Sequence, residues 1–217
     1  MTPNQITLLR VLMGFAAVAL FARDFWCDVA ALVLTIAAIT LDALDGYLAR
    51  RLKLATPLGA QLDILGDRVV ENLFFTFFAV TGLVSLWVPV LFFVRGTSTD
   101  FLRSLASRAG RNGFGANSML QTWWGRTLVA SRASRAAYGA MKCVCFCYLG
   151  VELTLVRLPA VALAPAQVAW VRAAAEALVL TTVAFCLIRA VPVLWEGRRY
   201  FFAASAAPVK TIAGSAQ

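Results

Sequence analysis

Four aspartates lie at fixed offsets within one short stretch of an otherwise apolar chain. Residues 42–67 follow the pattern D-x2-D-G-x2-A-R-x8-G-x3-D-x3-D. The first two aspartates are three residues apart and the last two are four apart, so each pair shares one face of a helix. A carboxylate at the centre of a membrane helix costs about 2.5–3.5 kcal/mol on insertion scales. Four together therefore predict a compensating ligand, for which divalent metal is the natural candidate.

The ligand chemistry of this stretch suits hard cations. Oxygen ligands favour Mg²⁺ or Mn²⁺. Two such ions would offset the charges of Asp42, Asp45, Asp63 and Asp67 and leave coordination positions for a diphosphate. The chain has no histidine, so an imidazole metal ligand or base is excluded. We expect a two-metal site in which carboxylates also carry the acid–base chemistry.

The other fixed residues fit a phosphate ligand. Gly46, Ala49 and Gly59 are small where backbone or ligand must approach closely. Arg50 adds a permanent cation whose fork matches phosphate. Thr56 precedes a proline at the expected start of a helix, so its hydroxyl is a candidate helix cap or ligand contact.

The elements that position these residues are expected to be membrane helices. The chain of 217 residues is 61% hydrophobic and has a mean hydropathy of +0.78, which is typical of an integral membrane protein. Apolar runs long enough to cross a bilayer occur at 6–22, 26–45, 60–83, 85–107, 134–156 and 166–195. The sequence predicts an all-α, polytopic bundle of six transmembrane helices.

The distribution of charge predicts an orientation. Twenty Lys and Arg stand against 11 Asp and Glu, and in a membrane chain this excess favours anionic lipid or a phosphorylated substrate over nucleic acid. Basic residues concentrate at 46–58 and 108–133, whereas the turn at 82–85 has no charge. By the positive-inside tendency, both basic loops, both termini and the aspartate cluster face the cytoplasm.

One membrane domain, residues 1–202, accounts for nearly the whole chain. The small and polar residues 203–217 are expected to form a disordered tail. Five cysteines are present, three of them in the apolar run C-V-C-F-C at 143–147, and we expect all five to serve apolar packing.

The eight fixed positions of the aspartate pattern match the signature of the CDP-alcohol phosphatidyltransferase family. The segment Pro3-Asn4-x2-Thr7-x2-Arg10 also resembles the one that precedes the first helix in that family. The resemblance implies a membrane enzyme that moves a phosphatidyl group from CDP-diacylglycerol to a small polar alcohol and releases CMP. The resemblance also implies that the protein could form a homodimer, as family members often do.

The resemblance implies a role for each matching residue. Asp42, Asp45 and Asp63 become metal ligands, and Asp67 becomes a residue next to the metal that acts as general base. The residues expected to contact the cytidine diphosphate portion are Gly46, Ala49, Arg50, Thr56 and Gly59, together with Asn4 and Thr7.

Arginines further along the chain are candidates for binding the acceptor. Arg95 and Arg103 are eight residues apart and resemble the R-x7-R segment of phosphatidylglycerophosphate synthases. Arg126 is a third candidate near the start of the fifth long helix. Such cations suit an acceptor phosphate, as in glycerol 3-phosphate. The alternative is that Arg103, in particular, is an arginine snorkelling at a helix end.

The residues after the third and fourth aspartates leave the acceptor open. Glycerophosphate-type enzymes usually have proline and lysine there, whereas this chain has Ile64 and Arg68. The arginine is more similar to the inositol-type branch, so inositol phosphate or inositol stays an alternative acceptor. Glu71 lies one turn beyond Asp67, and we expect it to pair with Arg68.

Two other classes of membrane protein also place acidic residues on helices. Intramembrane prenyltransferases resemble longer chains whose acidic motifs lie in distant halves. A non-enzymatic cation transporter is the alternative from another class. In this chain only 17 residues separate Asp45 from Asp63, unlike the prenyltransferases. A transporter does not require glycines, an alanine and an arginine at these fixed offsets, and the chain shows no inverted repeat.

Overall fold

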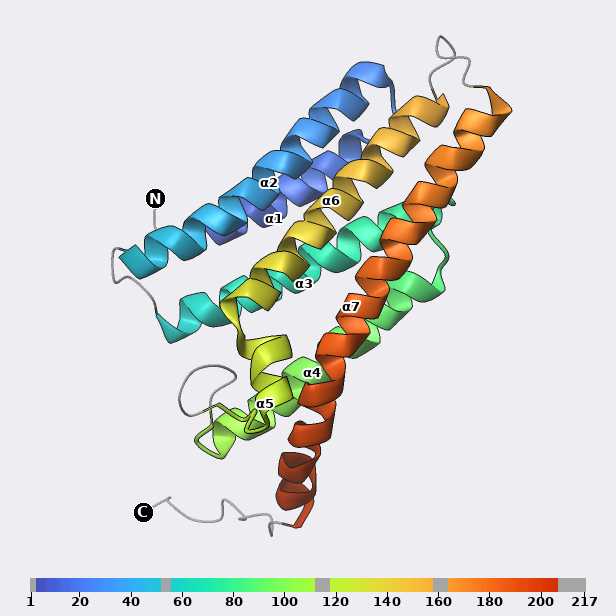
Figure 1. Ribbon diagram of the computed structural model, residues 1–217. Coiled ribbons are helices and arrows are strands. Elements are labelled where there is room, and N and C mark those ends of the chain that lie inside the picture. The colour runs from blue at the N-terminus through green and yellow to red at the C-terminus, as the bar shows by residue number, and fades with distance from the viewer. Residues whose placement is uncertain (1–2, 52–55, 112–117, 158–163, 207–217) are drawn as a thin grey trace, which may run out of the picture. The chain divides into compact units, whose positions relative to one another are not determined.

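The computed structural model describes residues 3–51, 56–111, 118–157 and 164–206, and every regular element in these ranges is a helix (Figure 1). The side chains of residues 42–51 lie outside the description. The long helices are α1 (Pro3–Leu20), α2 (Phe25–Arg51), α3 (Pro57–Val80), α4 (Trp87–Arg108), α6 (Arg132–Arg157) and α7 (Pro165–Ala206). Between α4 and α6 lie a short helix, α5 (Trp123–Gly125), and a π-helical turn, η1 (Arg126–Ala130). The predicted all-α class is therefore confirmed.

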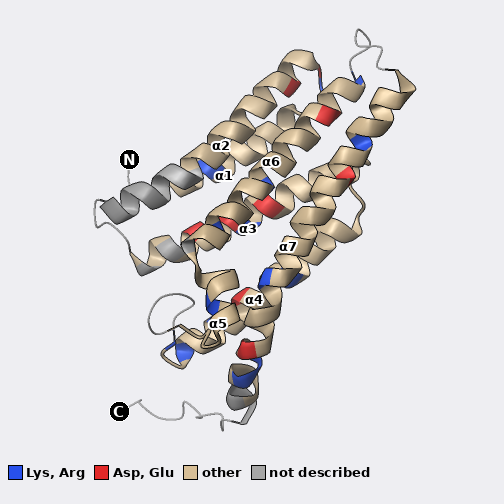
Figure 2. Ribbon diagram, in the orientation of Figure 1, with Lys and Arg blue, Asp and Glu red and all other residues tan. Residues whose placement is uncertain are grey.

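Two of the six predicted membrane spans have the length and composition of a span among the described residues. Ala133–Arg157 and Pro165–Phe202 are long and apolar enough to cross a bilayer, and Asn4–Leu20 and Phe25–Leu41 are shorter apolar helices. In α2, residues 29–41 carry no charge (Figure 2). On α1, Leu8, Leu12 and Phe15 form an outward stripe at helical spacing and are 50–62% exposed. Such a stripe suits contact with lipid.

Side chains at the helix starts accept hydrogen bonds from the first turn, where backbone N–H groups have no partner within the helix. Asp24 Oδ1 accepts from the N–H of Cys27 at 2.9 Å at the start of α2, and this bond lowers the pKa of Asp24. Thr56 Oγ1 accepts from the N–H of Gly59 at 3.0 Å at the start of α3. Thr56 is therefore a helix cap.

The described chain divides into two compact units. The first consists of Met1–Gly96 and Ala136–Cys186. In it α1 packs against α2 and α3, and a core of buried aromatic rings joins α3 to α4 and α6. The ring centroids of Phe75 and Phe92 are 4.3 Å apart, and those of Phe74 and Phe146 are 5.1 Å apart. This packing fixes α3, which carries the second half of the aspartate pattern.

The second unit consists of Thr97–Arg135 and Leu187–Gln217. Its α7 segment contacts the connection before α6 through polar side chains. Glu196 Oε2 accepts from the N–H of Gln121 at 2.6 Å and of Thr122 at 3.3 Å. Arg189 Nη1 donates to the carbonyl oxygen of Leu128 at 2.8 Å, and Arg199 Nη2 to that of Met119 at 2.5 Å. Helix α7 thereby holds the segment that precedes α6, in which the only described regular elements are α5 and η1.

The C-terminal end differs in detail from the prediction. Helix α7 continues past the predicted end at residue 195 to Ala206, so residues 203–206 of the predicted tail are helical. Residues 207–217 lie outside the described residues. All five cysteines are free thiols, and Cys145 and Cys186 are buried.

Candidate active site

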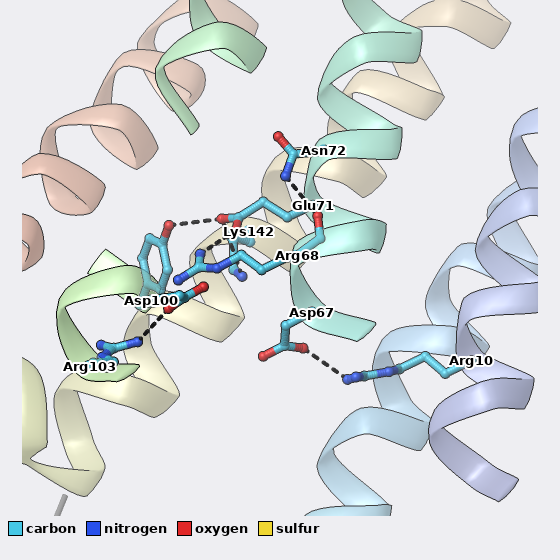
Figure 3. A network of polar contacts seen from close by, with 9 residues as sticks. Arg10, Asp67, Arg68, Glu71, Asn72, Asp100, Arg103 and Lys142 are labelled. Carbon is cyan, nitrogen blue, oxygen red and sulfur yellow. Dashed lines mark hydrogen bonds and ion pairs between the residues drawn. The ribbon is translucent and has the colours of Figure 1, made fainter. Parts of the chain in front are cut away.

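The side chain of Arg10, a residue of α1, bridges two aspartates of α3. Its Nη1 donates to Asp67 Oδ1 at 3.0 Å, and its Nη2 contacts Asp63 Oδ1 at 3.3 Å (Figure 3 shows the contact with Asp67). The Arg10 side chain is 3% exposed, whereas those of Asp63 and Asp67 are 49% and 47% exposed. Because the guanidinium is a rigid fork, these two contacts orient both carboxylates on the same face of α3.

Two glycines of α3 allow α1 to approach. A Cβ added at Gly66 would lie 2.9 Å from Arg10 Nη2 and 3.0 Å from Thr7 Cγ2. A Cβ added at Gly59 would lie 2.8 Å from Asn4 Oδ1. Residues 4, 7 and 10 share one face of α1, since they are spaced by three. This face therefore reaches the aspartates only because α3 lacks side chains at two positions.

Asp63 and Asp67 have the donor chemistry of a magnesium or manganese site. Each presents a half-exposed carboxylate on one helix face, and hard divalent cations prefer oxygen ligands. The Arg10 contacts use Oδ1 of each aspartate. The two residues present thus fit a divalent cation.

The other half of the predicted metal set cannot be compared with this geometry. The side chains of Asp42 and Asp45 lie outside the described residues, as do those of Gly46, Ala49 and Arg50. Among the side chains that are described, no group of three acidic or cysteine residues is placed to hold a metal ion. The four-aspartate site therefore stays a prediction.

A second polar cluster lies one turn further along α3, around Glu71. This carboxylate is 1% exposed, and its Oε2 lies 3.0 Å from Arg68 Nη1. Its Oε1 accepts from the hydroxyl of Tyr138 at 3.0 Å and lies 3.5 Å from Nζ of Lys142 (Figure 3). The predicted pairing of Glu71 with Arg68 is confirmed. The contacts with α6 join residues about 70 positions apart in the chain.

The three arginines predicted to bind the acceptor lie in different surroundings. In the first unit, Arg95 is 8% exposed, and its Cζ lies 5.9 Å from the centroid of the Tyr138 ring. In the second unit, Arg103 pairs with Asp100 at 3.1 Å, and Arg126 Nε donates to the carbonyl oxygen of Leu120 at 3.3 Å. An acceptor role for each of them stays a prediction.

The sequence-based list of site residues omits Arg10, Gly66, Tyr138 and Glu71. Arg10 had a signal, because it continues the spacing of three from Asn4 and Thr7. Gly66 also had one, since it precedes the last aspartate directly. Tyr138 had none, because its partner Glu71 is on another helix and no local pattern relates the two.

Comparison with known proteins shows similarity over part of the chain. Residues 1–155 match a family model described as CDP-alcohol phosphatidyltransferase. A CDP-diacylglycerol–glycerol-3-phosphate 3-phosphatidyltransferase of Pseudomonas fluorescens is 45% identical over 69 residues, which are 31% of this chain and 35% of the relative. Its namesake in Bacillus subtilis (strain 168) is 28% identical over 121 residues, which are 50% of this chain and 63% of the relative.

A plant protein is similar to this chain over as large a fraction as the Pseudomonas relative is. The cardiolipin synthase (CMP-forming) of Oryza sativa subsp. japonica is 38% identical over 73 residues, which are 31% of this chain and 21% of the relative. The chain thus spans about a third of the Pseudomonas relative and less than two thirds of the other two.

Proposed function

The chain belongs to the CDP-alcohol phosphatidyltransferase family, and we propose that it transfers a phosphatidyl group from CDP-diacylglycerol to a phosphorylated polyol, with release of CMP. The observation that carries the proposal is the contact of Arg10 with both Asp63 and Asp67 inside the family's aspartate pattern. The names of the bacterial relatives support glycerol 3-phosphate as the acceptor. Inositol phosphate is the second candidate acceptor, because an arginine, Arg68, follows the last aspartate, as in the inositol-type branch of the family. The positive charge of this arginine also suits a phosphate ester.

In the proposed reaction, Asp67 accepts the proton of the acceptor hydroxyl. The hydroxyl oxygen forms a bond to the β-phosphorus of the donor, and the bond from that phosphorus to the bridging oxygen breaks, so that CMP departs. Arg10 holds the base in place through Asp67 Oδ1, which leaves the exposed half of the side chain facing outward. A positioned carboxylate base contributes about 10²–10⁴-fold to such a step.

Divalent metal ions would balance the negative charges of the aspartates and of the donor's diphosphate. Two Mg²⁺ or Mn²⁺ ions held by Asp42, Asp45, Asp63 and Asp67 would supply Lewis-acid polarisation of the diphosphate. The support for this assignment is the oxygen-only donor set and the half-exposed pair on α3.

The cytidine diphosphate portion of the donor is proposed to contact two parts of the chain: the segment between the two aspartate pairs and the start of α1. Its candidate contacts are Gly46, Ala49, Arg50, Thr56, Gly59, Asn4 and Thr7. Support comes from Asn4, whose side chain lies against Gly59, one turn before Asp63. Arg95, Arg103 and Arg126 remain the proposed acceptor contacts.

The protein is an integral membrane protein, and we propose that its six long helices all cross the bilayer. The basic segments on either side of α3 and α4 support a cytoplasmic location for the site and for both termini. We also propose a homodimer, on the single ground that family members are expected to dimerise.

The test uses purified protein in lipid with CDP-diacylglycerol and glycerol 3-phosphate, inositol 1-phosphate, inositol or serine, with each product identified by mass. We expect product from a phosphorylated acceptor, loss of CMP release on chelation, and recovery with Mg²⁺ or Mn²⁺. Asp67→Asn should lower turnover at least ~100-fold, by the contribution of a positioned base. Asp24→Asn is the matched control, because asparagine also caps helices. Wild-type turnover in Asp67→Asn, or no product from either phosphorylated acceptor, would overturn the proposal.

A further inference from the structure

The second unit contains the pattern W-x-G-R twice. The first copy is Trp123–Arg126, at α5 and the start of η1, and the second is Trp195–Arg198, in α7. In both copies the tryptophan and the arginine are exposed, whereas the glycine between them is buried. The tryptophans are 80% and 56% exposed, which is high for so large a side chain. Each copy therefore turns a Trp–Arg pair away from the unit and a glycine toward it.

The two glycines allow both copies to pack closely within the unit. A Cβ added at Gly125 would lie 2.6 Å from Oε1 of Glu196, which is itself the second residue of the α7 copy. A Cβ added at Gly197 would lie 2.9 Å from Cδ1 of Leu102, on α4. Glu196 also accepts a hydrogen bond at 3.3 Å from the N–H of Thr122, the residue before the first copy. Both Trp–Arg pairs are thus anchored on their inner side.

Both arginines keep hydrogen-bond donors for a further partner. Cζ of Arg198 lies over the ring of Trp195, 3.8 Å from its centroid, and this cation–π contact supplies no acceptor oxygen. Arg126 donates from Nε to the carbonyl oxygen of Leu120 at 3.3 Å. Within the described part of the chain, neither guanidinium pairs with a carboxylate. The planar fork of arginine matches the oxygens of a phosphate group.

The second unit also carries nearly all of the net positive charge of the chain. Its sequence has ten Lys and Arg against two Asp and Glu, whereas the first unit has ten against nine. The two acidic residues already have partners inside the unit: Asp100 pairs with Arg103, and Glu196 accepts from two backbone N–H groups. The unit is therefore complementary in charge to an anionic partner.

The exposed face of α7 indicates which class of anion this partner belongs to. Between residues 187 and 194 its exposed side chains are all apolar, and Trp195 and then Arg198 follow on the exposed side of the helix. Phe202, 66% exposed, adds an aromatic ring beyond the arginine. Apolar side chains, an indole and a guanidinium in this order are typical of a helix that passes from the hydrocarbon core into the headgroup region. Neither a soluble anion nor nucleic acid requires an apolar surface beside the cations.

We propose that the two W-x-G-R segments form a binding surface for anionic phospholipid of the surrounding bilayer. The guanidiniums of Arg126 and Arg198 bind headgroup phosphate, and Trp123 and Trp195 lie at the boundary between headgroups and acyl chains. The same turn of α7 carries Glu196, which holds the connection before α6. A lipid bound here would therefore stabilise the part of α7 that orders that connection.

The test measures lipid binding in the absence of any acceptor. The purified full chain in detergent is titrated with phosphatidylserine or with phosphatidylcholine, and the bound lipid is counted by native mass spectrometry. We expect wild type to bind phosphatidylserine at least ~10-fold more tightly than phosphatidylcholine. Arg126→Gln and Arg198→Gln should each weaken phosphatidylserine binding about 5-fold, the contribution of one basic residue near an anionic surface. Binding of phosphatidylcholine should stay within about twofold.

Arg108→Gln is the matched control. Arg108 is an exposed arginine at the end of α4 in the same unit, and its loss changes the net charge by the same amount. It has no tryptophan one turn before it, because residues 104 and 105 are serine and leucine. We expect its phosphatidylserine binding to stay within about twofold of wild type. Because all three arginines are exposed, the variants should unfold at the temperature of wild type.

Three results would overturn the inference. An equal loss of phosphatidylserine binding in Arg108→Gln and Arg198→Gln would show that binding follows net charge alone. Equal affinity of wild type for the two lipids, or unchanged phosphatidylserine binding in Arg126→Gln or Arg198→Gln, would show that these segments do not select an anionic lipid. A change of oligomeric state in Arg198→Gln with lipid binding retained would assign the surface to a second copy of the chain.

Discussion

Arg10 is the residue on which the geometry of the candidate site depends most. One buried guanidinium contacts two half-exposed carboxylates on the neighbouring helix, at 3.0 Å and 3.3 Å. It therefore acts on the orientation of Asp63 and Asp67 and on the packing of α1 against α3 at the same time. Substitutions at this position should separate these effects, because lysine keeps the charge and loses the fork.

Arg10→Met should lower both stability and turnover. We expect the free energy of unfolding in detergent to fall by about 1–2 kcal/mol, a buried-pair value discounted because both aspartates are half exposed. Arg10→Lys should recover most of the stability and little of the turnover, since an ammonium cannot orient both carboxylates. Arg157→Met is the control, because Arg157 lies 4.0 Å from its partner Asp28 and is 41% exposed. Equal turnover in Arg10→Lys and wild type would contradict the orienting role.

Gly66 provides a steric test at the same contact. Gly66→Ala places a methyl group 2.9 Å from Arg10 Nη2 and 3.0 Å from Thr7 Cγ2, so α1 and α3 must separate or Arg10 must move. Overpacking of this kind destabilises by about 1–3 kcal/mol. Gly139→Ala, in α6, is the matched control, because its Cβ meets nothing within 4 Å and alanine favours a helix by about 0.5–1 kcal/mol. Thermal unfolding of both variants should give shifts of opposite sign.

At the scale of the elements, the second unit depends on the polar face of α7. Glu196, 7% exposed, accepts hydrogen bonds from two backbone N–H groups before α5 and also contacts the hydroxyl of Thr122 at 2.5 Å. A Cβ at Gly125 would lie 2.6 Å from Glu196 Oε1. The segment before α6 is therefore held by a side chain of α7 that follows it by more than 70 residues.

Glu196→Ala should loosen this segment. Two partly buried N–H groups lose a charged acceptor, which we expect to cost about 2 kcal/mol in local stability. Amide exchange at Gln121 and Thr122 should accelerate at least ~10-fold, because each 1.4 kcal/mol of opening free energy corresponds to a factor of ten. Glu176→Ala on the exposed side of α7 should leave exchange there unchanged. Unchanged exchange in Glu196→Ala would show that the side chain does not hold the segment.

The positions of the long helices could be predicted from sequence because each helix coincides with a mostly apolar run, although only two of the described helices are both long and apolar enough to cross a bilayer. The starts agree within three residues for all of them, as for α3, where Thr56 precedes the helix that begins at Pro57. The end of α7 was placed too early, because the charged residues Glu196, Arg198 and Arg199 stop the apolar run without stopping the helix. Hydropathy indicates which residues prefer the membrane, whereas a helix can continue into polar residues that follow the apolar run.

The local pairs of the site could also be predicted, whereas the contacts between distant helices could not. Arg68 and Glu71 are three residues apart, so helix geometry alone brings them together. The bridge from Arg10 and the contacts of Tyr138 and Lys142 depend on which faces of α1 and α6 meet α3. A single sequence carries no pattern that specifies those faces.

At the scale of the whole molecule, the described surface suits a bilayer. Large apolar side chains such as Trp26, Val80 and Trp170 are more than 75% exposed, which is unfavourable in water and ordinary in lipid. The chain also combines this surface with a net charge of +9. Both properties agree with an integral membrane protein that contacts anionic headgroups.

The proposed topology can be tested with single cysteines introduced into a variant that lacks the five native ones. Ser85→Cys, in the uncharged turn after α3, should react with an impermeant maleimide added outside intact cells. Ala109→Cys, after α4, should react only when the membrane is opened. Both positions are exposed and lie at opposite ends of α4. The same labelling pattern at both sites would exclude a membrane-crossing α4.

The bridge from Arg10 has a consequence for how the protein is made. A carboxylate without a counterion opposes the insertion of its helix into the membrane. Arg10 supplies that counterion from within the chain, 57 residues before Asp67. The first and third helices can therefore associate during biosynthesis through a contact that requires no metal ion.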